Sequence, residues 1–141
     1  MTKEKYNLIL DVDSYKVTHF NQYPQNTKKL YAYIEARNLN SEELIFFGLQ
    51  AFVKKYLLNP ITQDDIDEAE KFLLSHIGVF NRDDWEYILN EHGGFLPIEI
   101  KSLDEGTVTN KKIPLLDITN TDEKVPWLVT YIETALLRSL W

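Results

Sequence analysis

The stretch Lys29-Leu-Tyr-Ala-Tyr-Ile-Glu-Ala-Arg37 decides the fold class, because apolar and polar side chains alternate along it without a break. Such alternation places the two sets on opposite faces of a β-strand. The core face carries Leu30, Ala32, Ile34 and Ala36, and the aromatic and charged face carries Tyr31, Tyr33, Glu35 and Arg37. The stretch therefore predicts a strand that is covered by the core on one side only.

Short apolar segments at 8–10, 44–47, 97–103, 107–109 and 115–119 predict further strands. Apolar residues at helical spacing predict helices between them. A helical turn is predicted over 15–20, capped by Asp13 or Ser14, and a helix is predicted to begin after Gly48. A third helix runs from Thr62 to Gly78, with Asp65 completing a capping box. Two more are predicted after Asn81 and from Asp122 onward. We expect an α+β fold, a small mixed or antiparallel sheet with helices packed on one side.

The length of 141 residues suits one domain, and the chain contains neither a repeat nor a linker. The helical pattern that starts at Asp122 still runs at Trp141, without a glycine or a polar tail. Helices seldom end in this way. We therefore expect a single domain over 1–141 that has been truncated at its C-terminus, naturally or by engineering.

Composition narrows the function classes. A net charge of −7 argues against a general nucleic-acid binder, which shows a basic face. The lack of cysteine excludes disulfides, thiolate nucleophiles and cysteine-based zinc sites. The apolar run 8–10 is too short for a signal-peptide core, and no run approaches a membrane span. We expect a cytoplasmic protein that binds neither nucleic acid nor membranes.

The sequence carries no glycine-rich phosphate loop, nucleophile elbow or paired-histidine zinc helix. His19, His76 and His92 lie far apart, so we interpret each as a surface or structural histidine. The carboxylates in the first turns of the helix after Thr62 interact favourably with the positive end of the helix dipole, so we interpret them as structural. No catalytic residue and no metal ligand is therefore assigned.

Asp13 and Tyr15 follow the strand predicted at 8–10, and the carboxyl end of a strand is a common place for a ligand site. An aromatic ring supplies a stacking face and a carboxylate accepts an amide N–H, a combination that suits a flat polar heteroaromatic ligand. The residues alone leave two other interpretations open. Asp13 can be a helix cap, and the ring of Tyr15 can pack against the sheet.

Arg37 ends the strand predicted over residues 29–37. Its planar fork of donors can bind a phosphate through two hydrogen bonds. It can equally pair with Glu35 or Glu42 at the surface, where an ion pair contributes little.

Several segments in order along the chain carry a resemblance to a known family. The sequence from about residue 7 to 141 resembles the opening of nicotinamide phosphoribosyltransferases. The matching segments are Asp13-Ser-Tyr-Lys-Val-Thr-His19, Gln22-Tyr-Pro24, Tyr31-Ala-Tyr33, Phe47-Gly-Leu-Gln50, Trp85-Glu-Tyr-Ile-Leu89, Leu96-Pro-Ile-Glu-Ile-Lys101, Asn120-Thr-Asp122 and Ile132-Glu-Thr134.

The resemblance implies an enzyme of NAD salvage that makes nicotinamide mononucleotide and pyrophosphate from nicotinamide and phosphoribosyl pyrophosphate, with magnesium. It also implies homodimers whose active sites lie at the subunit interface. By the same resemblance, Tyr15 stacks on the nicotinamide ring, Asp13 lies near the carboxamide and Arg37 contacts phosphate groups. Lys16 and His19 receive no role.

The resemblance also shows what is missing. The chain stops before the family's catalytic barrel, and the segment after Arg37 is short beside the long loops of some members. Asn110-Lys-Lys112 stands where related chains often have Pro-Arg-Gly. We therefore expect this chain alone to be inactive and to hold no cofactor. It is either the N-terminal part of the enzyme or a free-standing, non-catalytic binding or regulatory module that associates with a full-length relative.

Overall fold

The computed structural model of the chain describes residues 6–38 and 40–140. Residues 1–5, 39 and 141 lie outside the described residues, so the interpretation of Trp141 as a truncated helix end is not addressed by the structure.

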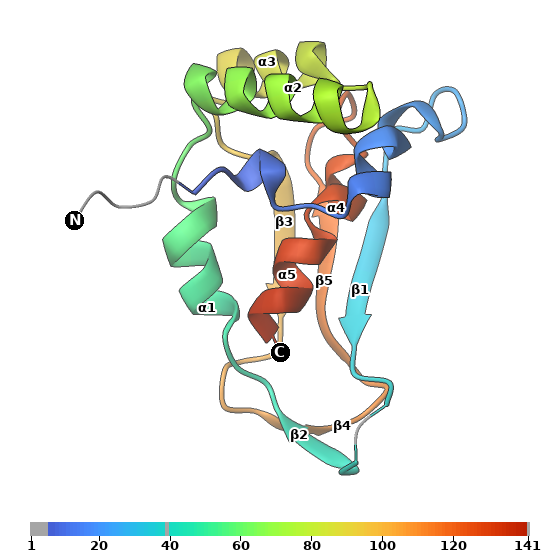
Figure 1. Cartoon of the computed structure of the whole chain (residues 1–141). Helices are drawn as coiled ribbons and strands as arrows, with labels where there is room; N and C mark the ends of the chain where they lie inside the picture. Colours follow the sequence, from blue (N-terminus) through green and yellow to red (C-terminus); the bar gives the residue numbers. More distant parts are fainter. Residues whose placement is uncertain (1–5, 39, 141) are drawn as a thin grey trace, which may run out of the picture.

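The centre of the fold is a three-stranded antiparallel sheet in the order β1-β5-β3 (Figure 1). Its strands are β1 (Tyr31–Glu35), β3 (Ile98–Ser102) and β5 (Pro114–Asn120). The register pairs Ala32 with Ile118, and Ile118 with Ile100, so that apolar side chains form one face. The opposite face carries Tyr31, Tyr33, Glu99, Lys101, Asp117 and Thr119. The predicted strand with one covered face is confirmed.

One layer of helical segments covers the apolar face of the sheet. It contains η1 (Leu8–Leu10), α1 (Leu49–Phe52), the π-helical turn η3 (Val53–Leu57), α4 (Leu128–Tyr131) and α5 (Glu133–Leu140). α5 lies in front of β5, with α1 beside it (Figure 1). The shared core includes Leu8, Ile34, Phe52, Leu116, Ile118, Val129, Ile132 and Leu136. The prediction of helices on one side of the sheet is confirmed.

A second core lies where α2 (Gln63–Ile77) and α3 (Arg82–Glu91) cross the end of the sheet at which β1 begins (Figure 1). It is built from Ile9, Val17, Ile66, Ala69, Leu73, Trp85, Ile88, Val125, Trp127, Leu128 and Tyr131. Val17 comes from η2 (Ser14–Asn21), a 3₁₀ helix that is thereby held against α4. Leu96 and Ile98 pack against both cores and join them.

A two-stranded ribbon of β2 (Glu43–Ile45) and β4 (Val108–Asn110) extends from the other end of the sheet (Figure 1). Gly48 follows this ribbon with φ of +110°, and a Cβ there would lie 2.5 Å from the carbonyl oxygen of Ser139. Only glycine fits this approach to α5. The strand predicted at 44–47 is present as β2 but ends at Ile45, and the helix opened by Gly48 is confirmed.

Two predicted elements are wrong. Residues 8–10 form the 3₁₀ helix η1 and not a strand, because Asn7 Oδ1 accepts the Ile9 N–H at 3.0 Å and fixes a turn. The helix predicted from Asp122 begins only at Leu128. Asp122 Oδ1 instead accepts the Lys124 N–H at 2.8 Å, which stabilises a local turn that competes with a helix.

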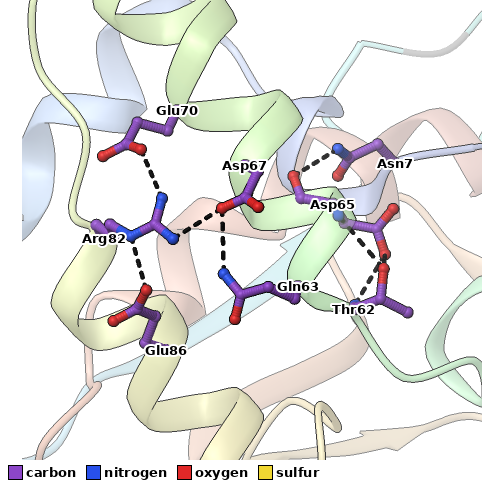
Figure 2. A network of polar contacts seen from close by, with 8 residues as sticks. All are labelled: Asn7, Thr62, Gln63, Asp65, Asp67, Glu70, Arg82 and Glu86. Carbon is purple, nitrogen blue, oxygen red and sulfur yellow. Dashed lines mark hydrogen bonds and ion pairs between the residues drawn. The ribbon is translucent and has the colours of Figure 1, made fainter.

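Polar contacts fasten α2 to its neighbours (Figure 2). The guanidinium group of Arg82 on α3 donates to Asp67 at 2.7 Å and to Glu70 at 2.5 Å, both on α2. It also donates to Glu86 of its own helix at 2.6 Å. On the other side of α2, the Asn7 amide donates to the Asp65 carbonyl oxygen at 2.8 Å.

The capping box predicted at the start of α2 is present. Asp65 Oδ2 accepts the Thr62 N–H at 2.8 Å, and Thr62 Oγ1 accepts the Asp65 N–H at 3.3 Å (Figure 2). The helix ends at Gly78, which has φ of +75°. None of the helices that the structure describes is long and apolar enough to cross a membrane.

We expect Thr62→Ala to lower the free energy of unfolding by about 0.5–2 kcal/mol, because the variant loses the side-chain cap. Urea denaturation followed by circular dichroism measures the change. Thr62→Ser keeps the hydroxyl and serves as the control, with a midpoint close to that of the unchanged chain. An alanine variant as stable as the serine variant would show that the cap contributes nothing.

Candidate ligand site

Asp13 lies at the N-cap position of η2, but its side chain makes no capping hydrogen bond. Its Oδ2 atom instead accepts a hydrogen bond of 2.8 Å from the hydroxyl of Thr134, on α5. The same hydroxyl accepts the Asp13 N–H at 3.3 Å. The interpretation of Asp13 as a helix cap is therefore wrong for its side chain, which joins η2 to α5.

The buried side chain of Lys16 adds an ion pair to this contact. Its side chain is only 4% exposed, although lysine is rarely buried. The ammonium group lies 3.3 Å from Asp13 Oδ2, 3.2 Å from Glu133 Oε2 and 3.2 Å from Thr134 Oγ1. A buried ammonium group needs such partners, because its desolvation is costly when it is unpaired.

These contacts lower the pKa of the Asp13 carboxyl group. The hydrogen bond from Thr134 is the largest cause, and the hydrogen bond and positive charge of Lys16 act in the same direction. Partial desolvation opposes them. Asp13 is therefore held as a carboxylate that accepts hydrogen bonds and does not donate them.

Tyr15 presents its ring to solvent beside this carboxylate. The residue is 60% exposed, so the interpretation that its ring packs against the sheet is wrong. The ring of His19 lies 5.4 Å away, and the ring of Tyr23 lies 6.5 Å from that of His19. These three side chains belong to η2 and the residues that follow it, and the exposed Tyr15 ring is available to a flat ligand.

Arg37 lies apart from this group. Residues 14–21 lie near the beginning of β1, whereas the chain reaches Arg37 after the end of that strand (Figure 1). The Arg37 side chain is 81% exposed, and its Nε atom lies 3.9 Å from Glu35 Oε1. The pairing with Glu35 foreseen from the sequence is present, but it is loose enough to leave the guanidinium group available.

The other candidate groups have structural partners. His76 Nε2 lies 2.8 Å from Ser14 Oγ, and His92 Nε2 lies 2.8 Å from Asp122 Oδ2. Within residues 6–38 and 40–140, no three histidine or acidic side chains gather where they could hold a metal ion.

Two open hollows on the described surface, of about 390 and 520 Å³, lie elsewhere. They share Lys55, Tyr56 and Arg138, and neither is lined by Asp13, Tyr15 or Arg37. Ligand sites are normally concave. The side chains of Asp13, Tyr15 and Arg37 lie on the surface, with Arg37 apart from the other two.

Sequence reasoning missed Thr134 and Glu133, which anchor the candidate carboxylate and its lysine. The Thr134 hydroxyl contacts Asp13 across 121 residues of sequence, and no spacing rule links positions so far apart. The only signal was their inclusion in the segment Ile132-Glu-Thr134, and that signal came from the family resemblance.

Comparison with known proteins supplies the class and then the family. The fold is similar to that of human nicotinic acid phosphoribosyltransferase, with a TM-score of 0.63 and 18% sequence identity over 91% of this chain and 25% of that one. The fold is thus one found within phosphoribosyltransferases. Residues 7–100 match the family model for the N-terminal domain of nicotinamide phosphoribosyltransferase.

Curated relatives agree with this match. The chain is 41% identical over 132 residues to the nicotinamide phosphoribosyltransferase of Xanthomonas campestris pv. campestris, covering 94% of this chain and 28% of the relative. It is 31% identical to that of Acinetobacter baylyi, covering 97% of this chain and 30% of the relative. The chain belongs to the nicotinamide phosphoribosyltransferase family and spans less than a third of the length of these relatives.

Proposed function

We propose that this chain supplies the N-terminal part of an enzyme that converts nicotinamide and phosphoribosyl pyrophosphate into nicotinamide mononucleotide and pyrophosphate. The observation that carries the proposal is the exposed Tyr15 ring beside the anchored carboxylate of Asp13. In the whole enzyme, Tyr15 stacks on the nicotinamide ring and Asp13 accepts the carboxamide N–H. Membership of the family and the match to its N-terminal domain support this assignment.

Arg37 contacts the phosphates of the sugar donor in this proposal. β1 is about 16 Å long at about 3.3 Å per residue, and it separates Arg37 from Asp13 and Tyr15. Arg37 therefore serves a different part of the bound ligands from Asp13 and Tyr15. A guanidinium fork binds phosphate through two charge-assisted hydrogen bonds. The 81% exposure of its side chain leaves Arg37 free to do so.

The remainder of the site belongs to parts of the enzyme outside this sequence. Transfer of phosphoribose needs groups that stabilise charge at the reacting carbon and at the leaving pyrophosphate. Tyr15 and Arg37 are exposed at separate places on this chain, and in this proposal a second body covers both. We propose that this body is a second subunit in a homodimer, and that magnesium is held by the donor and by residues outside this chain.

The proposal is tested with a chimeric enzyme. Residues 1–141 replace the matching N-terminal segment of the Xanthomonas campestris relative, to which they are 41% identical. Formation of nicotinamide mononucleotide with magnesium present is the expected result. A folded, dimeric chimera that forms no product would overturn the proposal and favour the alternative, a non-catalytic module that associates with a full-length relative. Association of the 141-residue chain with that relative, measured by light scattering, tests this alternative.

In the chimera, we expect Arg37→Ala to raise the KM for phosphoribosyl pyrophosphate by about ten- to a hundredfold, the scale of a lost charge-assisted hydrogen bond. The KM for nicotinamide should change little. Stability should also change little, because the contact with Glu35 is long and exposed. Lys101→Ala removes another exposed, paired cation and is the matched control. Equal effects of the two variants would contradict a specific role for Arg37.

A further inference from the structure

We propose that Thr134 and Lys16 are positioning residues that fix Oδ2 of Asp13 and thereby leave Oδ1 to accept the amide N–H of the ligand. The identity of that ligand rests on the function proposed above. The contact that holds the carboxylate, hereafter the Asp13 latch, consists of Asp13, Lys16, Glu133 and Thr134 and stands on the geometry alone.

The hydroxyl of Thr134 uses its full hydrogen-bonding capacity within the latch. It donates to Asp13 Oδ2 at 2.8 Å, and it accepts from Asp13 N at 3.3 Å and from Lys16 Nζ at 3.2 Å. A hydroxyl has one donor and two acceptor positions, and all three are used here. Its rotation is therefore fixed, and the Asp13 side chain is oriented by both its carboxylate and its backbone.

The ammonium group of Lys16 donates a hydrogen bond to Thr134 and forms ion pairs with Asp13 and Glu133. It has three N–H donors and three acceptors within reach, namely Asp13 Oδ2, Glu133 Oε2 and Thr134 Oγ1. The Lys16 side chain is 4% exposed, so little water is available to replace a lost partner. A buried group with this partner set holds one geometry, which links η2 to the first turn of α5.

The latch uses one side of the Asp13 carboxylate. Within the part of the chain that the structure describes, the side-chain contacts of this carboxylate all go to Oδ2. The side chain as a whole is 46% exposed, and in this proposal Oδ1 accepts from an external donor. Lys16 also lies 5.8 Å from the centre of the Tyr15 ring, so the residue that holds the carboxylate also contacts the stacking surface.

A latch that served only to hold η2 on α5 would, when broken, change the stability and the pKa of Asp13 but not the KM for nicotinamide. Thr134→Val removes the hydroxyl and nearly keeps the shape of the side chain. In the 141-residue chain we expect this variant to raise the pKa of Asp13, because its largest lowering contact is lost. Carbon-13 NMR titration of the Asp13 carboxyl group measures the change. Thr134→Ser restores the hydroxyl and should restore the pKa.

The second readout is kinetic and uses the chimeric enzyme. We expect Thr134→Val to raise the KM for nicotinamide about tenfold, the scale of one misplaced hydrogen bond, with the KM for the sugar donor unchanged. Lys16→Met should act in the same direction and provides a second variant if Thr134→Val fails to fold. Thr134→Ser should behave like the unchanged enzyme.

The outcomes separate the latch from the ligand assignment. An unchanged Asp13 pKa in folded Thr134→Val and Lys16→Met chains would overturn the latch. A raised pKa with an unchanged KM for nicotinamide would overturn the positioning role, provided that Tyr15→Ala still raises that KM. If Tyr15→Ala leaves the KM unchanged as well, the proposed nicotinamide site is wrong, and the pKa result still decides whether the latch exists.

Discussion

Replacing Tyr15 by alanine is expected to weaken the use of nicotinamide by about 1–3 kcal/mol in kcat/KM, the scale of an aromatic stack on a flat heterocycle. The residue is 60% exposed and its ring contacts His19 at 5.4 Å, so the fold loses little when the ring is removed. The effect should therefore be functional and appear as a loss of nicotinamide use in the chimeric enzyme. The melting temperature should stay close to that of the unchanged enzyme.

Two variants control this experiment. Tyr15→Phe keeps the ring and should keep most of the activity. Tyr31→Ala removes another exposed tyrosine, 65% exposed on the open face of the sheet, and should leave nicotinamide use unchanged. If Tyr15→Ala and Tyr31→Ala gave the same kinetics, the assignment of Tyr15 to the nicotinamide ring would be wrong.

Replacing Trp85 by alanine is expected to lower the free energy of unfolding by about 3–5 kcal/mol, the usual cost of removing a buried aromatic side chain. Trp85 is 2% exposed. Its ring meets Trp127 at 5.1 Å and Tyr131 at 5.2 Å, both nearly edge-to-face. The variant loses apolar burial and both ring contacts, and it leaves a cavity between α3 and α4.

Urea denaturation monitored by circular dichroism measures this loss. The matched control is Phe72→Ala, since Phe72 lies on α2 and is 56% exposed. Its substitution should cost less than about 1 kcal/mol, because an exposed ring has little burial to lose. A Trp85→Ala chain as stable as the Phe72→Ala chain would contradict the second core described above. Because small domains are stable by only about 5–15 kcal/mol, the folded fraction of the Trp85 variant should also be lower at 37 °C than that of the unchanged chain.

The sequence by itself determined the elements whose signals are local. The alternation around Ile34 predicted β1 and its covered face, because the period of two follows from strand geometry. Thr62, Asp65 and Gly78 predicted both ends of α2, because capping depends on side chains within one turn of the helix end. The family match was likewise carried by short segments read in order.

The tertiary structure decided the features that depend on distant partners. Residues 8–10 became a 3₁₀ helix, with the Ile9 carbonyl oxygen accepting the Tyr131 hydroxyl at 2.7 Å across 122 positions, instead of joining a sheet. The Asp13 side chain makes no capping hydrogen bond, one of the interpretations that the sequence left open, and contacts Thr134 and Lys16 instead. Such contacts form only after the chain has folded, because loop closure brings α5 to η2. No local pattern in the sequence encodes which carboxylate the Thr134 hydroxyl will meet.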